Sequence, residues 1–333
     1  MLEKPDIADE LILSRLQEEY EIQADELNFL SSGDLNTAAY SLFAGDGTKY
    51  FLKLRKSFSE IIVTIPVFLS SQDIENIIVP YQTRSMRYWA DFGNHKIILY
   101  PFIESKNGFE IELSDQQKRN LGTALRAIHS TQIPPQFTRH MPKETFSPEW
   151  RECVKSFPAR AEAISLRDPI AAKLAVFMKS KKDLINHVVE RAERLASELQ
   201  AKFLELVLCH SDIHGRNILL TGSDKLYIVD WDNPILAPKE RDLMFIGGGI
   251  DNIWKSERDE AVFYEGYGKT EIDLSALAYY RYERIIQDIA DYGEQVLSSD
   301  KAESDRERFY RYFVTNFEPG TRIEIAEKTV KFN

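Results

Sequence analysis

A polar loop between two apolar runs carries side chains suited to acid–base and metal chemistry. Residues 206–208 and 218–220 are aliphatic, and the segment between them contains His210, Asp212 and Asn217 in a His-x-Asp-x-x-x-x-Asn spacing. A carboxylate can accept the proton of a hydroxyl group. Carboxylate and amide oxygens are also the ligands that Mg²⁺ prefers. The segment is therefore either a solvated turn or a reaction site held between two buried strands.

Two further charged residues stand in apolar surroundings. Asp230 ends the apolar run 226–229, and Lys53 lies within the apolar run 50–54. Taken singly, Asp230 could be a turn residue, His210 a hydrogen-bonded core histidine, and Lys53 an edge-strand lysine that faces water. Together, a strand lysine, an aspartate, an asparagine and a second aspartate in this order match the template of phosphoryl transfer.

Composition excludes several classes of function. The 333 residues carry a net charge of −11, which argues against a nucleic-acid binder because phosphates require a basic surface. No apolar run is long enough for a membrane span, and the first residues lack the pattern of a secretory signal. Two cysteines without paired spacing predict neither a disulfide framework nor a thiolate metal site. We therefore expect a cytoplasmic protein that binds neither nucleic acid nor membrane.

The acidic surplus is concentrated late in the chain. Residues 230–294 contain 15 Asp and Glu against 7 Lys and Arg. This stretch predicts either solvated helix faces or a pocket for a cationic small molecule.

The elements that must position these residues change in type along the chain. The first hundred residues alternate strand-like runs with turns, including a hairpin at Gly45–Gly47, a possible helix at 60–71 and a strand at 94–104. Later segments are helical. The expected helices are one that opens with a Ser114/Gln117 capping box, and others at 150–157, 169–200 and onward to about residue 315. The pattern predicts an α+β protein with a small β-rich N-terminal lobe (1–103, including a connector) and a larger, mainly helical C-terminal lobe (104–333).

The motifs resemble those of the aminoglycoside phosphotransferase family. The segments CHSDIHGRN (209–217) and IVDWD (228–232) carry the resemblance. They differ from protein kinases in reading His-Ser-Asp rather than His-Arg-Asp and Asp-Trp-Asp rather than Asp-Phe-Gly. No Ala-Pro-Glu segment follows. The segments 230–249, 263–268 and 279–293 narrow the resemblance to the branch that phosphorylates spectinomycin. The resemblance implies a protein-kinase-like bilobal fold.

For the nucleotide, the resemblance implies ATP bound with Mg²⁺. Lys53 would neutralise oxygens of the α- and β-phosphates, and Glu60 would pair with Lys53 unless it is an exposed residue at a helix start. The nucleotide loop 31–38 has one glycine, Gly33, where a full glycine-rich loop would have three. The resemblance also implies that backbone groups of the connector hydrogen-bond the adenine, namely those of Tyr100, Pro101, Phe102 and Ile103.

For the reaction, the resemblance implies that Asn217 and Asp230 hold Mg²⁺ and that Asp212 is the catalytic base. The acceptor would be a cationic small molecule, with spectinomycin favoured and its 9-hydroxyl as the phosphorylated group. Its contacts would come from Asp212 and from a set of acidic residues further along the chain: Asp232, Glu283 and Asp288.

Three other residues near these motifs are not expected to take part directly in the reaction. His210 is expected to brace the loop, Asp242 to be a structural carboxylate, and His214 to be an exposed loop residue.

Several alternatives stay open at this point. One is another aminoglycoside kinase, and another is a metabolic kinase acting on choline, homoserine or a sugar. A catalytically inactive nucleotide-binding module is a third, although the four motif residues argue against it. A protein kinase is disfavoured, because no activation segment is recognisable.

Overall fold

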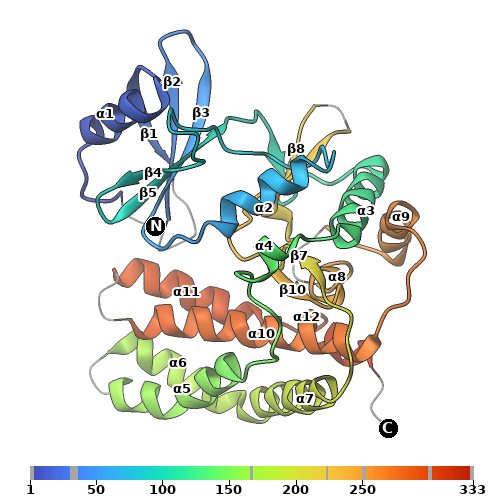
Figure 1. Ribbon diagram of the computed structural model, residues 1–333. Coiled ribbons are helices and arrows are strands. Elements are labelled where there is room, and N and C mark those ends of the chain that lie inside the picture. The colour runs from blue at the N-terminus through green and yellow to red at the C-terminus, as the bar shows by residue number, and fades with distance from the viewer. Residues whose placement is uncertain are drawn as a thin grey trace. The chain divides into compact units, whose positions relative to one another are not determined.

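The computed structural model in Figure 1 describes residues 4–30, 37–165, 168–222, 224–249, 253–298 and 302–330. The chain forms two compact units, each made of two chain segments. The first unit comprises Met1–Met141 and Gly215–Pro234, and the second comprises Pro142–His214 and Ile235–Asn333. The predicted boundary between residues 103 and 104 separates two functional lobes rather than two compact units, and it stays a prediction.

An antiparallel sheet forms the N-terminal part of the first unit (Figure 1). Its strand order in the described chain is β1-β2-β3-β5-β4. The strands are β1 (Ala24–Leu30), β2 (Thr37–Ala44), β3 (Lys49–Arg55), β4 (Ala90–Phe92) and β5 (His95–Pro101). The predicted hairpin is confirmed, because Phe43 pairs with Lys49 across the turn. The strand predicted at 94–104 corresponds to β5.

One face of this sheet packs on an N-terminal helix. Side chains of successive strand residues point to opposite faces. Leu52 and Leu54 of β3 are buried in one apolar cluster with Ile12 and Leu16 of α1 (Asp9–Tyr20). Lys53 therefore points away from this cluster, which fixes the face of β3 available for chemistry.

The remainder of the first unit includes three helices and a small sheet. The helices are α2 (Ile61–Ser70), α3 (Asp115–Ser130) and α4 (Pro135–Thr138). The small sheet has the order β6-β8-β9, with β6 (Lys106–Asn107), β8 (Ile218–Leu220) and β9 (Leu226–Ile228), and the 3₁₀ turn η1 (Gly215–Asn217) precedes β8. Ser114 caps α3 with the predicted capping box. The helix α2 forms although Pro66 lies inside it, because its apolar residues are buried.

The second unit is mainly helical. Its two short strands, β7 (Val207–Cys209) and β10 (Ile235–Ala237), pair antiparallel. Its helices are α5 (Glu149–Ser165), α6 (Pro169–Ser180), α7 (Lys182–Gln200), α8 (Glu240–Leu243), α9 (Glu257–Tyr267), α10 (Leu274–Leu297), α11 (Glu303–Thr315) and α12 (Arg322–Thr329). The small sheet region followed by a larger helical part agrees with the α+β, kinase-like fold predicted from the sequence.

The helix α10 organises the second unit. It is 24 residues long and is capped by the Asp273 side chain, which accepts hydrogen bonds from Ser275 N–H and Ala276 N–H. It contacts α5, α7, α11 and α12, and Figure 1 shows it as a long helix labelled α10. Because it is surrounded, most of its length is buried, including charged residues that must find partners inside the unit. None of the described helices combines the length and apolar character needed to cross a bilayer.

Candidate active site

In the first unit, Lys53 lies on an interior strand and contacts two carboxylates. The strand β3 pairs with both β2 and β5, so the edge-strand alternative is wrong. Lys53 Nζ lies 2.6 Å from Asp230 Oδ1 and 3.3 Å from Asp232 Oδ1. The structure therefore brings together a strand lysine and the motif aspartate that lies 177 residues later.

Arg55 adds a second cation to this cluster. It lies two residues after Lys53, on the same face of β3, and forms an ion pair with Asp232. We define the first-unit cluster as Lys53, Arg55, Asp230 and Asp232. Arg55 was not among the predicted site residues, although its spacing of two residues from Lys53 placed it on the same face of the strand.

The two carboxylates keep Lys53 charged. Burial alone would lower the pKa of Lys53, but the negative charges of Asp230 and Asp232 outweigh this effect and raise the pKa above its ordinary value. The lysine side chain is 14% exposed, whereas that of Asp230 is 42% exposed. The cluster thus combines a half-buried cation with a carboxylate side chain that solvent can reach.

The same pair of strands positions Asn217 and Asp230, because Asn217 directly precedes β8 and Asp230 comes shortly after β9. Ile218 of β8 pairs with Ile228 of β9, and Val229 N–H donates to Asn217 O at 3.0 Å. The residues predicted to bind Mg²⁺ therefore lie at one end of this strand pair. Asp230 has a φ of 69°, in the left-handed region that non-glycine residues seldom adopt. An amide oxygen and a carboxylate are hard oxygen donors, so this pair suits Mg²⁺ chemically.

The predicted adenine connector continues from β5. Tyr100 and Pro101 end that strand, and Phe102 N–H donates to Lys49 O at 3.3 Å. The ammonium of Lys49 lies 3.6 Å from the centre of the Phe102 ring, and Ser105 Oγ donates to Ile103 O at 3.1 Å. The connector is thus fixed to β3, and its contacts with adenine stay a prediction.

One predicted nucleotide-binding residue is not brought into this cluster. Glu60 is exposed at the N-cap of α2. Among the described residues Lys53 pairs with Asp230 and Asp232, so the predicted Glu60–Lys53 ion pair is wrong in this structure. The physical reason is that two carboxylates already neutralise the lysine. Gly33 lies outside the described residues.

In the second unit, a buried carboxylate fixes the loop that carries Asp212. Asp242 is fully buried and accepts hydrogen bonds from His210 N–H at 2.9 Å and from Ser211 N–H at 2.6 Å. His210 Nδ1 in turn accepts from Asp212 N–H at 3.3 Å. The supporting roles predicted for Asp242 and His210 are confirmed. Ser211 has a φ of 73°, so the backbone turns sharply immediately before Asp212.

Asp212 has two basic neighbours. Arg284 Nη1 lies 2.7 Å from Asp212 Oδ1, and His214 Nε2 lies 3.4 Å from Asp212 Oδ2. Burial alone would raise the pKa of Asp212, but Arg284 and His214 outweigh it and hold the pKa well below its ordinary value. Asp212 is therefore a carboxylate at neutral pH. The prediction that His214 is exposed is wrong, because its side chain is 18% exposed and faces Asp212.

Arg284 is itself held by a second carboxylate. Its Nε lies 3.0 Å from Asp288 Oδ1, and Asp288 Oδ2 forms an ion pair with Arg322. We define the second-unit cluster as Asp212, Arg284, Asp288 and Arg322. Asp288, predicted to contact the acceptor, is buried between two arginines, and this geometry favours a supporting role. The i,i+4 spacing of Arg284 and Asp288 on α10 was the sequence signal for this pair.

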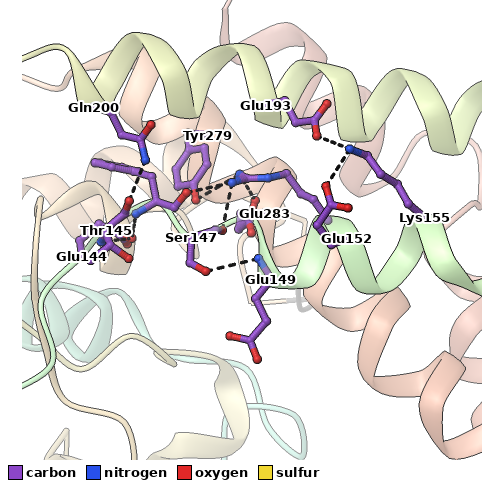
Figure 2. A network of polar contacts seen from close by, with 12 residues as sticks. Glu144, Thr145, Ser147, Glu149, Glu152, Lys155, Glu193, Gln200, Tyr279 and Glu283 are labelled. Carbon is purple, nitrogen blue, oxygen red and sulfur yellow. Dashed lines mark hydrogen bonds and ion pairs between the residues drawn. The ribbon is translucent and has the colours of Figure 1, made fainter.

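Glu283 belongs to a different, structural network of the second unit. Figure 2 shows it beside Tyr279 and Ser147, where Arg151 Nη1 lies 2.9 Å from Glu283 Oε2. Burial raises the pKa of Glu283 to about 7, although the charge of Arg151 opposes this shift. Since Arg151 also donates to the carbonyls of Phe146 and Ser147, these contacts tie α5 and α10 together. The geometry favours this role over the predicted contact with an acceptor.

Comparison with known proteins places the chain in a family. Residues 89–280 match the phosphotransferase enzyme family. A curated relative, protein StrN from Streptomyces griseus, is 24% identical over 206 residues, which cover 60% of this chain and 64% of that relative's length.

Solved structures are similar over the whole chain. A crystal structure of spectinomycin phosphotransferase, APH(9)-Ia, in complex with ADP and spectinomycin is 37% identical, with a TM-score of 0.90, and the match covers 98% of this chain and 99% of that one. Its AMP-bound complex is also 37% identical, with a TM-score of 0.85 and coverage of 95% and 97%. The amicoumacin kinase hAmiN, at 14% identity, a TM-score of 0.65 and coverage of 98% and 96%, shares the fold alone. The chain therefore belongs to the phosphotransferase enzyme family of aminoglycoside phosphotransferases, and it is a phosphotransferase.

Proposed function

We propose that this phosphotransferase uses ATP and Mg²⁺ to phosphorylate a hydroxyl group of spectinomycin and thereby confers resistance to that antibiotic. The observation that carries the kinase part is the ion pair between Lys53 and Asp230, which joins the interior strand β3 to the segment after β9. A strand lysine for the phosphates and an aspartate for the metal ions are two of the recurring parts of phosphoryl transfer from a nucleotide.

The acceptor is proposed from similarity and charge. The spectinomycin phosphotransferase that is 37% identical over 98% of this chain binds ADP and spectinomycin. Spectinomycin carries methylamino groups that are cationic near neutral pH, and residues 230–294 have 15 acidic against 7 basic side chains. Opposite charge favours the encounter of such a ligand with this region. We propose the 9-hydroxyl as the acceptor group.

Nucleotide binding is assigned to the first unit. Lys53 would exchange its carboxylate partners for oxygens of the α- and β-phosphates, which carry comparable negative charge. Backbone groups between Tyr100 and Ile103 would hydrogen-bond the adenine edge, and Gly33 is assigned to the same nucleotide. Because ATP is a cytoplasmic substrate, we propose the cytoplasm as the compartment of this reaction.

The residues that would hold Mg²⁺ are Asn217 and Asp230. Their oxygen donors and their position at one end of the β8–β9 pair suit that ion. When bound, the ion would neutralise negative charge on the phosphate oxygens. Asp230 contacts Lys53 through Oδ1 at 2.6 Å, and its side chain is 42% exposed, so an ion could reach this carboxylate from solvent.

Asp212 is assigned to the acceptor. Its carboxylate would accept a hydrogen bond from the acceptor hydroxyl. It would take the proton as the γ-phosphoryl group passes from ATP to the hydroxyl oxygen and ADP is formed. A loose transition state depends on alignment more than on a strong base, so the low pKa of Asp212 is compatible with this role. The low pKa also keeps Asp212 unprotonated and able to accept.

A coupled assay of ADP release tests the proposal. Purified protein with MgATP would be offered spectinomycin, streptomycin, kanamycin, choline and homoserine separately. We expect turnover with spectinomycin to exceed that with every other acceptor, and ³¹P–¹H correlation spectra of the product to show phosphate on the 9-hydroxyl. Expression in a susceptible strain should raise the spectinomycin concentration needed to stop growth.

The outcomes separate the alternatives. Preferred turnover of choline or homoserine would identify a metabolic kinase, and preferred turnover of kanamycin or streptomycin another aminoglycoside kinase. Stabilisation by MgATP without turnover of any acceptor would indicate a nucleotide-binding module.

A further inference from the structure

The arginine beside Asp212 lies in the middle of a chain of alternating charges. Arg284 Nη1 contacts Asp212 Oδ1 at 2.7 Å, and Arg284 Nε contacts Asp288 Oδ1 at 3.0 Å. We propose that Arg284 is a positioning residue of the transfer reaction, which fixes the Asp212 carboxylate so that one of its oxygens faces the acceptor hydroxyl. This inference rests on the proposed function, because it assigns Arg284 to the base used there.

The two oxygens of Asp212 have different surroundings. Oδ1 accepts a short hydrogen bond from a guanidinium, whereas Oδ2 lies 3.4 Å from His214 Nε2, at the limit of a hydrogen bond. A carboxylate held through one oxygen loses its freedom to rotate about the Cβ–Cγ bond. The rest of the carboxylate is then held in a defined orientation, as a group that accepts the hydroxyl proton requires.

Arg284 can hold Asp212 because two other residues fix its own position. Asp288 binds its Nε, and the guanidinium lies 5.4 Å from the centre of the Phe245 ring. Asp288 is in turn paired with Arg322, which also donates to Asn316 Oδ1 at 3.1 Å. The side chains of Arg284 and Asp288 are only 16% and 8% exposed. The chain of contacts thus extends from the loop of Asp212 through α10 to the first residue of α12.

The geometry requires an arginine at this position. Separate nitrogen atoms of one planar group reach Asp212 and Asp288 simultaneously. A lysine has a single nitrogen on a flexible stem, so it can neutralise Asp212 without fixing its orientation. Charge and position can therefore be separated by substitution.

The first test compares three variants in the coupled assay with spectinomycin. We expect Arg284→Gln to lower kcat about 100-fold with little change in the KM for ATP, since misplacing a reacting group by about 1 Å has an effect of this size. Arg284→Lys should recover part of the loss and stay about 10-fold below wild type. The matched control is Arg281→Gln on the same helix, which loses hydrogen bonds to Thr329 and Ile246 but leaves Arg284 in place. It should lower the melting temperature while keeping kcat within about 2-fold of wild type.

A second pair of measurements separates positioning from a structural role. Asp288→Asn should lower kcat less than Arg284→Gln, because Arg284 keeps its contact with Asp212 but loses its anchor. Addition of millimolar guanidinium chloride should restore part of the activity of Arg284→Ala, and it should not restore Arg281→Ala. If Arg284→Gln kept the wild-type kcat, or if Arg281→Gln lost as much kcat as Arg284→Gln, the positioning role would be wrong.

A readout without turnover separates this inference from the proposed function. In a crystal structure of Arg284→Gln we expect the Asp212 carboxylate to leave its wild-type rotamer. An unmoved, well-ordered Asp212 in that variant would overturn the inference even if the enzyme is active. Absence of wild-type turnover with spectinomycin, together with a displaced Asp212 in the variant, would overturn only the proposed acceptor.

Discussion

The two charged clusters differ in how firmly their carboxylates are held. In the first-unit cluster, Asp230 is 42% exposed, and its partner is a lysine with a flexible stem. In the second-unit cluster, Asp288 is 8% exposed and lies between two arginines, and Arg284 fixes Asp212 through a planar group. Because its carboxylate is more exposed and its cation more flexible, we expect the first cluster to exchange partners more readily than the second.

Loss of the base should have the largest effect on turnover. We expect Asp212→Asn to lower kcat by about 10²- to 10⁴-fold, because an amide cannot accept the hydroxyl proton. Binding of MgADP, measured by calorimetry, should remain within a few-fold of wild type, since Asp212 is assigned to the acceptor. Nearly normal turnover in this variant would mean that Asp212 does not take part in the reaction. The comparison of the two clusters would then lose its functional basis.

Loss of the lysine should come next and should affect a different step. Lys53→Met removes the cation assigned to the phosphates, so kcat/KM for ATP should fall about 10²- to 10³-fold. The matched control is Lys56→Met, an exposed lysine just after the same strand. Equal losses in the two variants would mean that general positive charge near β3, rather than the position of Lys53, matters for ATP.

Ligand-induced stabilisation can show which cluster changes partners. At an MgADP concentration of 100 times Kd, wild type should gain about 2.7 kcal/mol in free energy of unfolding. At that same concentration we expect most of the gain to vanish in Lys53→Met and to persist in Arg284→Gln. Thermal unfolding with and without MgADP measures both, and a lost gain in Arg284→Gln would mean that the clusters are not independent.

A smaller effect is expected from the structural network around Glu283. Its pKa of about 7 lies above the ordinary 4.5, so the folded protein binds more protons than the unfolded chain between these values. The contribution of Glu283 to stability therefore falls as pH rises through this window, by about 2 kcal/mol between pH 5 and 8. Glu283→Gln should remove this dependence, which urea unfolding at several pH values would show. Unchanged pH dependence in the variant would mean that Glu283 ionises normally.

Local patterns in the sequence were sufficient to predict several features of both units. The capping box at Ser114 and the hairpin at Gly45–Gly47 depend on neighbouring residues, so short-range rules identified them. The proximity of Lys53 and Asp230 was expected, because the template of phosphoryl transfer contains a strand lysine and a later aspartate in this order.

The partners of the remaining charges could not be predicted in this way. Arg284 contacts Asp212 across 72 residues, and Arg151 contacts Glu283 across 132. No periodicity specifies such pairs, because they depend on how whole helices pack. The sequence showed that α10 carries acidic residues. It did not show whether each carboxylate faces a ligand or an arginine. For this reason Glu283 and Asp288 were assigned to an acceptor, while Arg284 was overlooked.

The left-handed backbone at Ser211 and Asp230 has a consequence for how this protein can be improved. Both residues adopt a conformation that glycine adopts with less strain, at a typical expense of about 1–3 kcal/mol each. A selection for heat resistance alone would favour glycine at Ser211, where the side chain has no assigned chemical role. The same change would give the neighbouring backbone more freedom next to Asp212. We therefore expect Ser211→Gly to raise the melting temperature and lower kcat, so that selection for heat resistance alone would act against turnover at this position.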